Sequence, residues 1–204
     1  MKKSIISIAQ TSEISWHPLT SALYQTLIRC YDNDYIKQVS EIGEQQFPLI
    51  PQTIYFISTG KSQHKSKKGS VNTEVRNYQI VAGVFNPWFV ENSIKHKKSQ
   101  KTLIGLSSEN EQSQQDFEQE VAKLIIGDFF NAVSSANMPF IGSSYFGLNE
   151  VESTLAKQFF MDLIGEKLIA DNYAKFFGIT RDALYKQLEK ANRNHRINPT
   201  QSLI

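Results

Sequence analysis

The clearest periodic pattern of apolar residues lies between residues 116 and 133. Seven apolar side chains recur there three or four residues apart or as adjacent pairs, which predicts a helix with one wide apolar face. They are Phe117, Val121, Leu124, Ile125, Phe129, Phe130 and Val133. Ser113 and Asp116 have the spacing of a capping pair, so we expect this helix to begin between them.

Shorter apolar runs before residue 110 predict strands. Residues 53–57, 77–82 and 102–106 are rich in β-branched or aromatic side chains. Residues 4–9 and 12–16 form either short strands or a loop that leads into a helix. The polar, basic stretch 58–73 contains two glycines and is typical of a mobile hairpin loop joining two strands.

Two helices are expected in the first fifth of the chain. Pro18 suits the first turn of a helix, where its missing N–H costs nothing. Leu19, Leu23, Leu27 and Ile28 would form the apolar face of that helix. A second helix should follow from about Asp34 and end near Gly43.

The segment 134–147 is small, polar and glycine-containing, which indicates a boundary between two domains. We therefore expect an α+β chain, with a mixed αβ domain over residues 1–145 and an all-α domain over residues 146–204. Apolar residues recur at helical spacing from Val151 to Ile164, which predicts the first helix of the second domain.

Residues 170–188 have the pattern of a helix-turn-helix. Ala174 is small enough for two helices to touch, and Gly178 accepts the positive φ that a tight turn requires. Thr180 can cap the next helix through its hydroxyl group. Leu184 and Leu188, one turn apart, would hold that helix against the core.

The opposite face of the second helix would then be polar and free to contact DNA in a major groove. We expect phosphate or base contacts from eight residues: Thr180, Arg181, Asp182, Tyr185, Lys186, Gln187, Arg193 and Arg196. Two packed helices in a protein-interaction module would share the same spacing, so binding to another protein is an alternative.

Charge is unevenly distributed although the net charge is only +2. Residues 61–101 hold nine Lys or Arg against two acids, or +7, whereas residues 109–123 hold five acids and one Lys, or −4. The tail 181–204 holds five Lys or Arg and two acids, or +3. Concentrated positive charge attracts phosphate backbones without reading their sequence, although solvated loops show the same pattern.

Cysteine usage and hydropathy bear on the compartment. The single cysteine, Cys30, excludes an intramolecular disulfide and favours the cytoplasm. No stretch is long and apolar enough to predict a membrane span, and the basic N-terminus is followed by too short an apolar run for a signal peptide.

Four motifs resemble the ParB-type partition proteins. The run from Gly178 to Leu188 is similar to their helix-turn-helix, and residues 148–152 (LNEVE) resemble the entry to that domain, with Glu150 in place of a proline. Residues 78–83 (YQIVAG) resemble a strand of the ParB/sulfiredoxin-like fold, and residues 35–42 resemble its first helix. The resemblance implies a dimeric DNA-binding protein in plasmid or mobile-element partition, maintenance or transcriptional regulation.

The sequence departs from that family after Gly83. ParB proteins have an acidic residue and arginines there, which contact nucleotide phosphates, whereas this chain continues Val84-Phe85-Asn86-Pro87. A phosphate site needs cations or free backbone N–H groups, so we expect neither CTP nor another cofactor to bind here.

Candidate catalytic chemistry is sparse. The four histidines are scattered, no zinc or Walker motif is present, and Gly142-Ser143-Ser144 is not a nucleophile elbow. The sequence therefore favours a non-enzymatic protein with no metal site. A nuclease or a nucleotide-dependent enzyme on the ParB/sulfiredoxin scaffold is the alternative.

Overall fold

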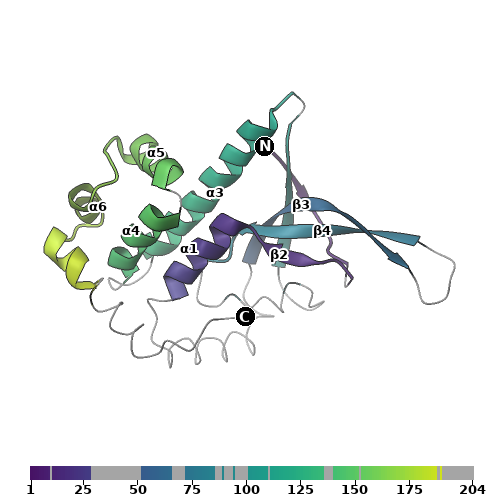
Figure 1. The fold of residues 1–204 in the computed structure, drawn as a ribbon, viewed down its shortest axis with the longest axis horizontal. Helices are drawn as coiled ribbons and strands as arrows, with labels where there is room; N and C mark the ends of the chain where they lie inside the picture. The colour runs from purple at the N-terminus through teal and green to yellow at the C-terminus, as the bar shows by residue number, and fades with distance from the viewer. Residues whose placement is uncertain are drawn as a thin grey trace. The chain divides into compact units, whose positions relative to one another are not determined.

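The chain combines one five-stranded sheet with several helices (Figure 1). A computed structural model describes residues 1–9, 11–28, 52–65, 72–85, 89, 94, 101–109, 111–135, 140–151, 153–187 and 189. The expected α+β class is confirmed. The predicted helix at 34–43 lies outside the described residues, as do Cys30, Leu188, Arg193 and Arg196.

The sheet is mixed, with strand order β1-β5-β3-β4-β2. Its strands are β1 (Lys2–Ile5), β2 (Ile14–Trp16), β3 (Gln52–Lys65), β4 (Asn72–Ala82) and β5 (Lys101–Ser107). β3 is antiparallel to β4 and parallel to β5, β1 is antiparallel to β5, and β2 is parallel to β4. The strands expected at 53–57, 77–82 and 102–106 are thereby confirmed.

The expected loop at 58–73 is wrong over most of its length. β3 continues to Lys65 and pairs there with Asn72, the first residue of β4. The ladder extends through this polar stretch because its hydrogen bonds join main-chain groups, which every residue other than proline supplies in full. The two strands form a long ribbon instead of a flexible connection.

The helices are α1 (Pro18–Ile28), α3 (Gln114–Ser135), α4 (Phe140–Val151), α5 (Ser153–Ile164) and α6 (Ala170–Phe176). α1 begins at Pro18 as expected. The Ser113 hydroxyl donates to Asp116 Oδ2 at 2.6 Å and accepts from the Asp116 N–H at 3.1 Å, which confirms the capping pair before α3. α4 begins at Phe140, so residues 140–147 of the small, polar segment are helical.

Two compact units divide the chain, and both α1 and α3 contribute to each of them. The first unit comprises Met1–Thr20 and Val39–Ile125, and the second comprises Ser21–Gln38 and Ile126–Ile204. Each unit therefore combines segments that are far apart in sequence.

The core of the first unit is built on β3 and β4. Ile54, Phe56 and Ile80 are fully buried, and the rings of Phe56 and Tyr78 meet edge to face with centroids 6.2 Å apart. The Thr20 hydroxyl, itself buried, donates to the Val81 carbonyl at 2.6 Å and fastens the start of α1 to β4.

Gly83 directly follows β4 and is required by close packing. Its φ is +85°, and a Cβ atom at this position would overlap the main-chain oxygen of Thr53. Val84 and Phe85 are buried beside it. The glycine of the YQIVAG motif therefore serves backbone packing, and the two residues after it belong to the core.

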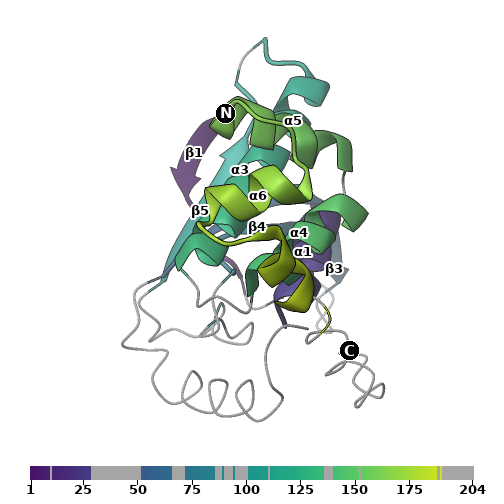
Figure 2. The same cartoon turned by 90° about the vertical axis from the view of Figure 1, so that its left-hand side faces the viewer.

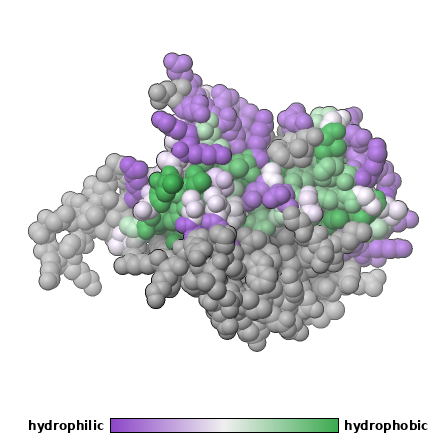
Figure 3. Space-filling view, turned by 180° about the vertical axis from the view of Figure 1, so that it is seen from behind, coloured by the Kyte–Doolittle hydropathy of each residue, from purple (hydrophilic) through white to green (hydrophobic). Residues whose placement is uncertain are grey.

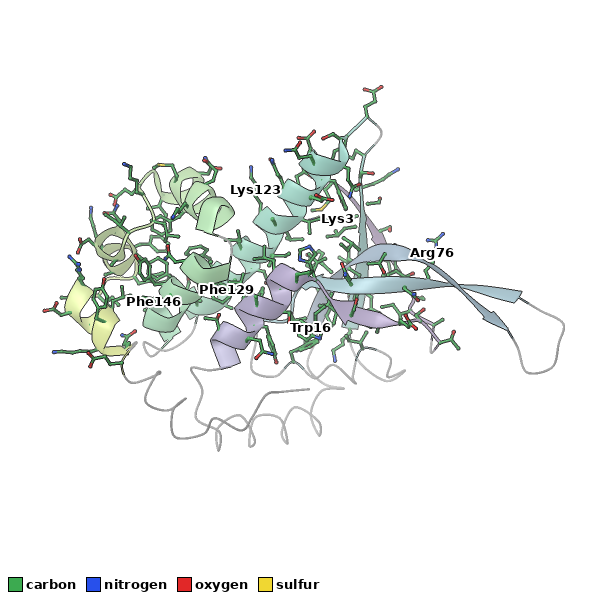
Figure 4. The ribbon with its side chains drawn as sticks, viewed as in Figure 1. Lys3, Trp16, Arg76, Lys123, Phe129 and Phe146 are labelled. Atoms are coloured by element: carbon green, nitrogen blue, oxygen red, sulfur yellow. The ribbon has the colours of Figure 1, made fainter. Side chains whose placement is uncertain are left out.

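The core of the second unit contains a cluster of aromatic side chains. Phe129 and Phe130 of α3, Phe160 of α5 and Tyr173 of α6 are all buried, and the ring centroids of Phe130, Phe160 and Tyr173 lie 5.8–6.0 Å apart. Phe129 is labelled on α3 in Figure 4. The apolar stripe expected on α3 is thus confirmed, and Phe160 of the stripe expected on α5 is buried.

The face of the molecule drawn in Figure 3 carries both hydrophilic and hydrophobic areas of the described residues. Hydrophilic residues crowd the upper margin of the face in Figure 3, with hydrophobic residues exposed in smaller areas between them. Among the large apolar side chains that the structure describes, Ile5 on the edge strand β1 is the most exposed, at 82%. Among the helices that the structure describes, none has the length and hydropathy needed to span a bilayer.

Candidate nucleic-acid interface

The candidate interface comprises α6, the turn after it and the helical residues 181–187 (Figure 2). α6 buries Ala170, Tyr173 and Ala174 against the second unit's core. Tyr173 is fully buried and Ala174 is 1% exposed, so the small residue lies where the sequence pattern required close approach.

The turn after α6 is a Schellman motif centred on Gly178. The N–H of Ile179 donates to the Ala174 carbonyl at 2.9 Å, and the N–H of Gly178 donates to the Lys175 carbonyl at 3.1 Å. Gly178 has a φ of +68°, the left-handed conformation that the sequence predicted for it. This turn ends α6 and redirects the chain.

The next helix starts at Thr180. Its hydroxyl oxygen accepts a hydrogen bond from the Ala183 N–H at 3.2 Å, and its carbonyl accepts from the Leu184 N–H at 3.1 Å. Thr180 is therefore the N-cap, as expected. Leu184 is fully buried and anchors the helix, whereas Ile179 is only half-buried.

Four of the predicted contact residues lie on the exposed side of this helix: Arg181, Asp182, Tyr185 and Lys186. Tyr185 is 38% exposed and rests edge-on against Phe146, with centroids 6.2 Å apart. Phe146 is labelled on α4 in Figure 4. The Tyr185 ring is thus held in place while part of it remains accessible.

Arg181 makes contacts that the sequence did not indicate. Its Nη1 lies 3.5 Å from Asp171 Oδ2, and its guanidinium carbon lies 5.6 Å from the centre of the Tyr185 ring. Hydrogen bonding to Tyr185 and the charge of Asp171 raise the pKa of Arg181. Both members of the ion pair are more than half exposed, so water and salt screen it.

Gln187 has a different environment from the one its sequence position suggested. Its side-chain oxygen accepts a hydrogen bond from the Gly142 N–H in α4 at 3.1 Å, and the residue is half-buried. Gly142 is the third residue of α4, where main-chain N–H groups have no partner within the helix. Gln187 therefore joins the helix after the turn to the first turn of α4.

The charges around the interface balance. From Glu166 to Glu189 the sequence has four cations (Lys167, Lys175, Arg181, Lys186) and four acids (Glu166, Asp171, Asp182, Glu189). Lys175 is paired with Glu166 at 3.4 Å and Arg181 with Asp171. Two of the four cations are therefore already held by acids of the same segment.

The described residues near the interface bring no metal-binding group together, and Ser144 lies in the core. Within the described ranges, no three His, Cys, Asp or Glu side chains come together as a metal site would require. Ser144, the second of the two serines after Gly142, is buried and hydrogen-bonded to Tyr173, so it is part of the core.

Comparison with known proteins gave no match: no family model, no curated protein and no solved structure matches this chain.

Proposed function

We propose that this protein binds double-stranded DNA through the helix-turn-helix of residues 170–187 and acts in partition, maintenance or transcription of a plasmid or mobile element. The observation that supports DNA binding is the Schellman turn at Gly178 followed by the Thr180 cap, with Leu184 inward. This arrangement leaves Arg181, Tyr185 and Lys186 exposed on one short helix.

The exposed side chains suit a recognition helix, which contacts both phosphates and base edges. Arg181 and Lys186 can neutralise phosphates, and Arg181 can also make a bidentate contact with guanine. Tyr185 adds a hydroxyl group and a flat apolar surface. The balanced charge of residues 166–189 means that affinity would come from these few placed groups more than from a general positive field.

A single helix of this length contacts few phosphates, so the proposal includes a homodimer. Two copies would engage half-sites one helical turn of DNA apart, about 34–36 Å. A dimer doubles the number of contacts on one DNA molecule without requiring a more basic domain.

The test is the salt dependence of binding to duplex DNA. Wild-type protein should bind at low salt, with a log–log slope of about −0.9 for each phosphate neutralised. The double variant Arg181→Glu, Lys186→Glu should bind more than about 100-fold more weakly, because each charge-assisted bond contributes roughly 1.5–3 kcal/mol.

The matched control is Lys157→Glu, Lys167→Glu, which makes the same change in net charge at two exposed residues outside the helix. It should retain most of the affinity. Equal loss in both double variants would assign binding to overall charge. No shift of any DNA by the wild type at low salt would overturn this proposal and favour a protein-interaction module.

A further inference from the structure

The outer part of β3 and β4 forms a two-stranded ribbon, which we define as residues 58–65 and 72–77. β5 pairs with β3 only over Gln52–Ile57, and β2 pairs with β4 only over Tyr78–Ile80. Among the described strands, the ribbon's residues therefore pair with each other, apart from Ser58, which lies opposite Tyr78 at the base of the ribbon. Figure 1 shows this part of β3 and β4 extending past the other strands of the sheet.

A bulge marks the base of the ribbon. The β3–β4 register shifts between Ser58 and Gly60, and Gly60 has a φ of +139°, a conformation that favours glycine. An irregularity of this kind bends a strand pair and increases its twist, so it redirects the two strands beyond the bulge. In that outer part, pairing is regular from Lys61 opposite Arg76 to Lys65 opposite Asn72.

The charge of the ribbon is costly for an isolated hairpin. Lys61 and Arg76 occupy directly paired positions, and like charges opposite each other destabilise a strand pair. Because side chains alternate between the two faces of a strand, positions 61 and 65 lie on the same face of β3. Arg76 of β4 lies opposite position 61. Arg76 is exposed, and it is labelled in Figure 4 near the point where the ribbon leaves the sheet.

The sequence adds more positive charge between the two strands. The six residues that join them include Lys67 and Lys68, so residues 58–77 hold five cations and one acid, or +4. A polyanion that neutralises these charges would remove the repulsion between them. The pairing of Lys61 with Arg76 is unfavourable in the free protein, but it is expected where the two positive charges bind phosphates.

The composition and shape of the ribbon select the kind of polyanion. Its strands, STGKSQHK and NTEVRN, contain one apolar residue, Val75, which offers no wedge for a lipid bilayer. From Gly60 to Lys65 the ribbon is about 17 Å long at roughly 3.4 Å per residue. The major groove of B-DNA admits a two-stranded ribbon and is about 8.5 Å deep, whereas that of A-form RNA is too narrow for side chains.

We propose that the β3–β4 ribbon is a second DNA-binding element, which contacts the phosphates and major groove of duplex DNA through Lys61, Lys65 and Arg76. This proposal rests on the proposed function in one respect, because both name duplex DNA as the ligand. It does not depend on DNA contacts by the recognition helix. The polar side chains between the cations, which include Ser62 and Gln63, are of types that bond to phosphates and base edges.

The test compares three variants of the full chain on the same duplex, each with its thermal melting curve. The ribbon variant is Lys61→Gln, Lys65→Gln, Arg76→Gln. The control is Lys2→Gln, Lys123→Gln, Lys157→Gln, which removes three exposed cations elsewhere. The third is Arg181→Glu, Lys186→Glu. The ribbon variant should lose up to about 2.7 in the magnitude of the salt slope, at about 0.9 per phosphate contact.

The outcomes separate the two proposals. If the ribbon variant keeps the wild-type salt slope while Arg181→Glu, Lys186→Glu loses binding, the ribbon proposal is overturned and the recognition-helix proposal stands. A smaller slope in the ribbon variant alone supports the ribbon even where the helix variant binds normally. Equal changes in the ribbon variant and the control would overturn the ribbon, as would wild-type binding to RNA duplexes or anionic vesicles but not to DNA.

A photo-crosslinking residue at Gln63 gives a readout independent of charge. It should crosslink to duplex DNA, whereas the same residue at exposed Thr53, on the part of β3 within the sheet, should not. An absence of crosslinks at position 63 while the complex is fully formed would overturn the proposal.

Discussion

The hydroxyl oxygen of Tyr173 lies 2.6 Å from the hydroxyl oxygen of Ser144, and both side chains are buried. The Ser144 hydroxyl also donates to the Ile141 carbonyl at 2.8 Å, so its single proton is used there and Tyr173 is the donor in the pair. This bond joins α6 to α4. It places a polar contact inside an otherwise apolar core, and it holds α6, the first helix of the candidate interface, against α4.

The two partners of this bond should not contribute equally. Ser144→Ala leaves the buried Tyr173 hydroxyl without its acceptor, which should lower the free energy of unfolding by about 1–3 kcal/mol. The better helix propensity of alanine offsets roughly 0.5 kcal/mol of this loss. Tyr173→Phe removes the donor and should cost only about 1 kcal/mol. Urea unfolding of both single variants and the double variant measures this, and a double variant as unstable as the sum of the two would show that the bond contributes nothing.

Gly178 should be sensitive to substitution for conformational reasons alone. Its φ is +68° and a Cβ atom there would meet nothing within 4 Å, so Gly178→Ala should cost about 1–2 kcal/mol of unfolding free energy. Gly178→Asn should cost less, because asparagine tolerates this conformation. Gly165, with a φ of +76° and equally open surroundings, is the matched control for stability. An alanine tolerated at position 178 but not at 165 would contradict the Schellman turn.

His17 should make stability depend on pH. Burial lowers its pKa, partly offset by the charge of Glu118, and its Nδ1 accepts the Leu19 N–H at 3.3 Å at the start of α1. A lowered pKa means that the unfolded chain binds the proton more readily. The unfolding free energy should therefore be highest above about pH 6.5 and fall as the pH drops below it.

His17→Asn tests this pH dependence. Asparagine can cap the same helix but does not titrate, so the variant should lose the dependence between about pH 5 and 7 while keeping its stability at pH 8. Denaturant unfolding across that range gives the comparison. Parallel pH profiles for the variant and the wild type would exclude His17 as the group responsible.

Asp171 should weaken DNA binding by competing for Arg181. The surface pair between them contributes about 0.2–1 kcal/mol, so Asp171→Asn should tighten binding to duplex DNA by about 1.5- to 5-fold at low salt. The gain should shrink as salt rises, since salt already screens the pair. Asp162→Asn, an exposed acid on α5, controls for net charge, and an equal gain in both variants would contradict a specific effect of Asp171.

Features that depend on a few neighbouring residues could be predicted from the sequence. Pro18 at the start of α1, the Ser113–Asp116 cap, the positive φ of Gly178 and the Thr180 cap are all confirmed. Each rests on a side chain or a φ angle acting within about four residues. The DNA-binding role of residues 180–187 remains a proposal, because it concerns a partner and not the chain's own conformation.

Contacts between distant segments were decided only by the tertiary structure. The strand order, the extension of β3 and β4 through polar residues, the bond from Gly142 to Gln187 and the Tyr173–Ser144 pair could not be predicted. Main-chain hydrogen bonds form irrespective of side-chain type, and the partners of a side chain 29 or 45 residues away depend on how whole helices pack. Local pattern therefore determined where α1, α3 and the helix after Gly178 begin. Strand pairing and packing determined how far β3 and β4 extend and which polar groups face one another.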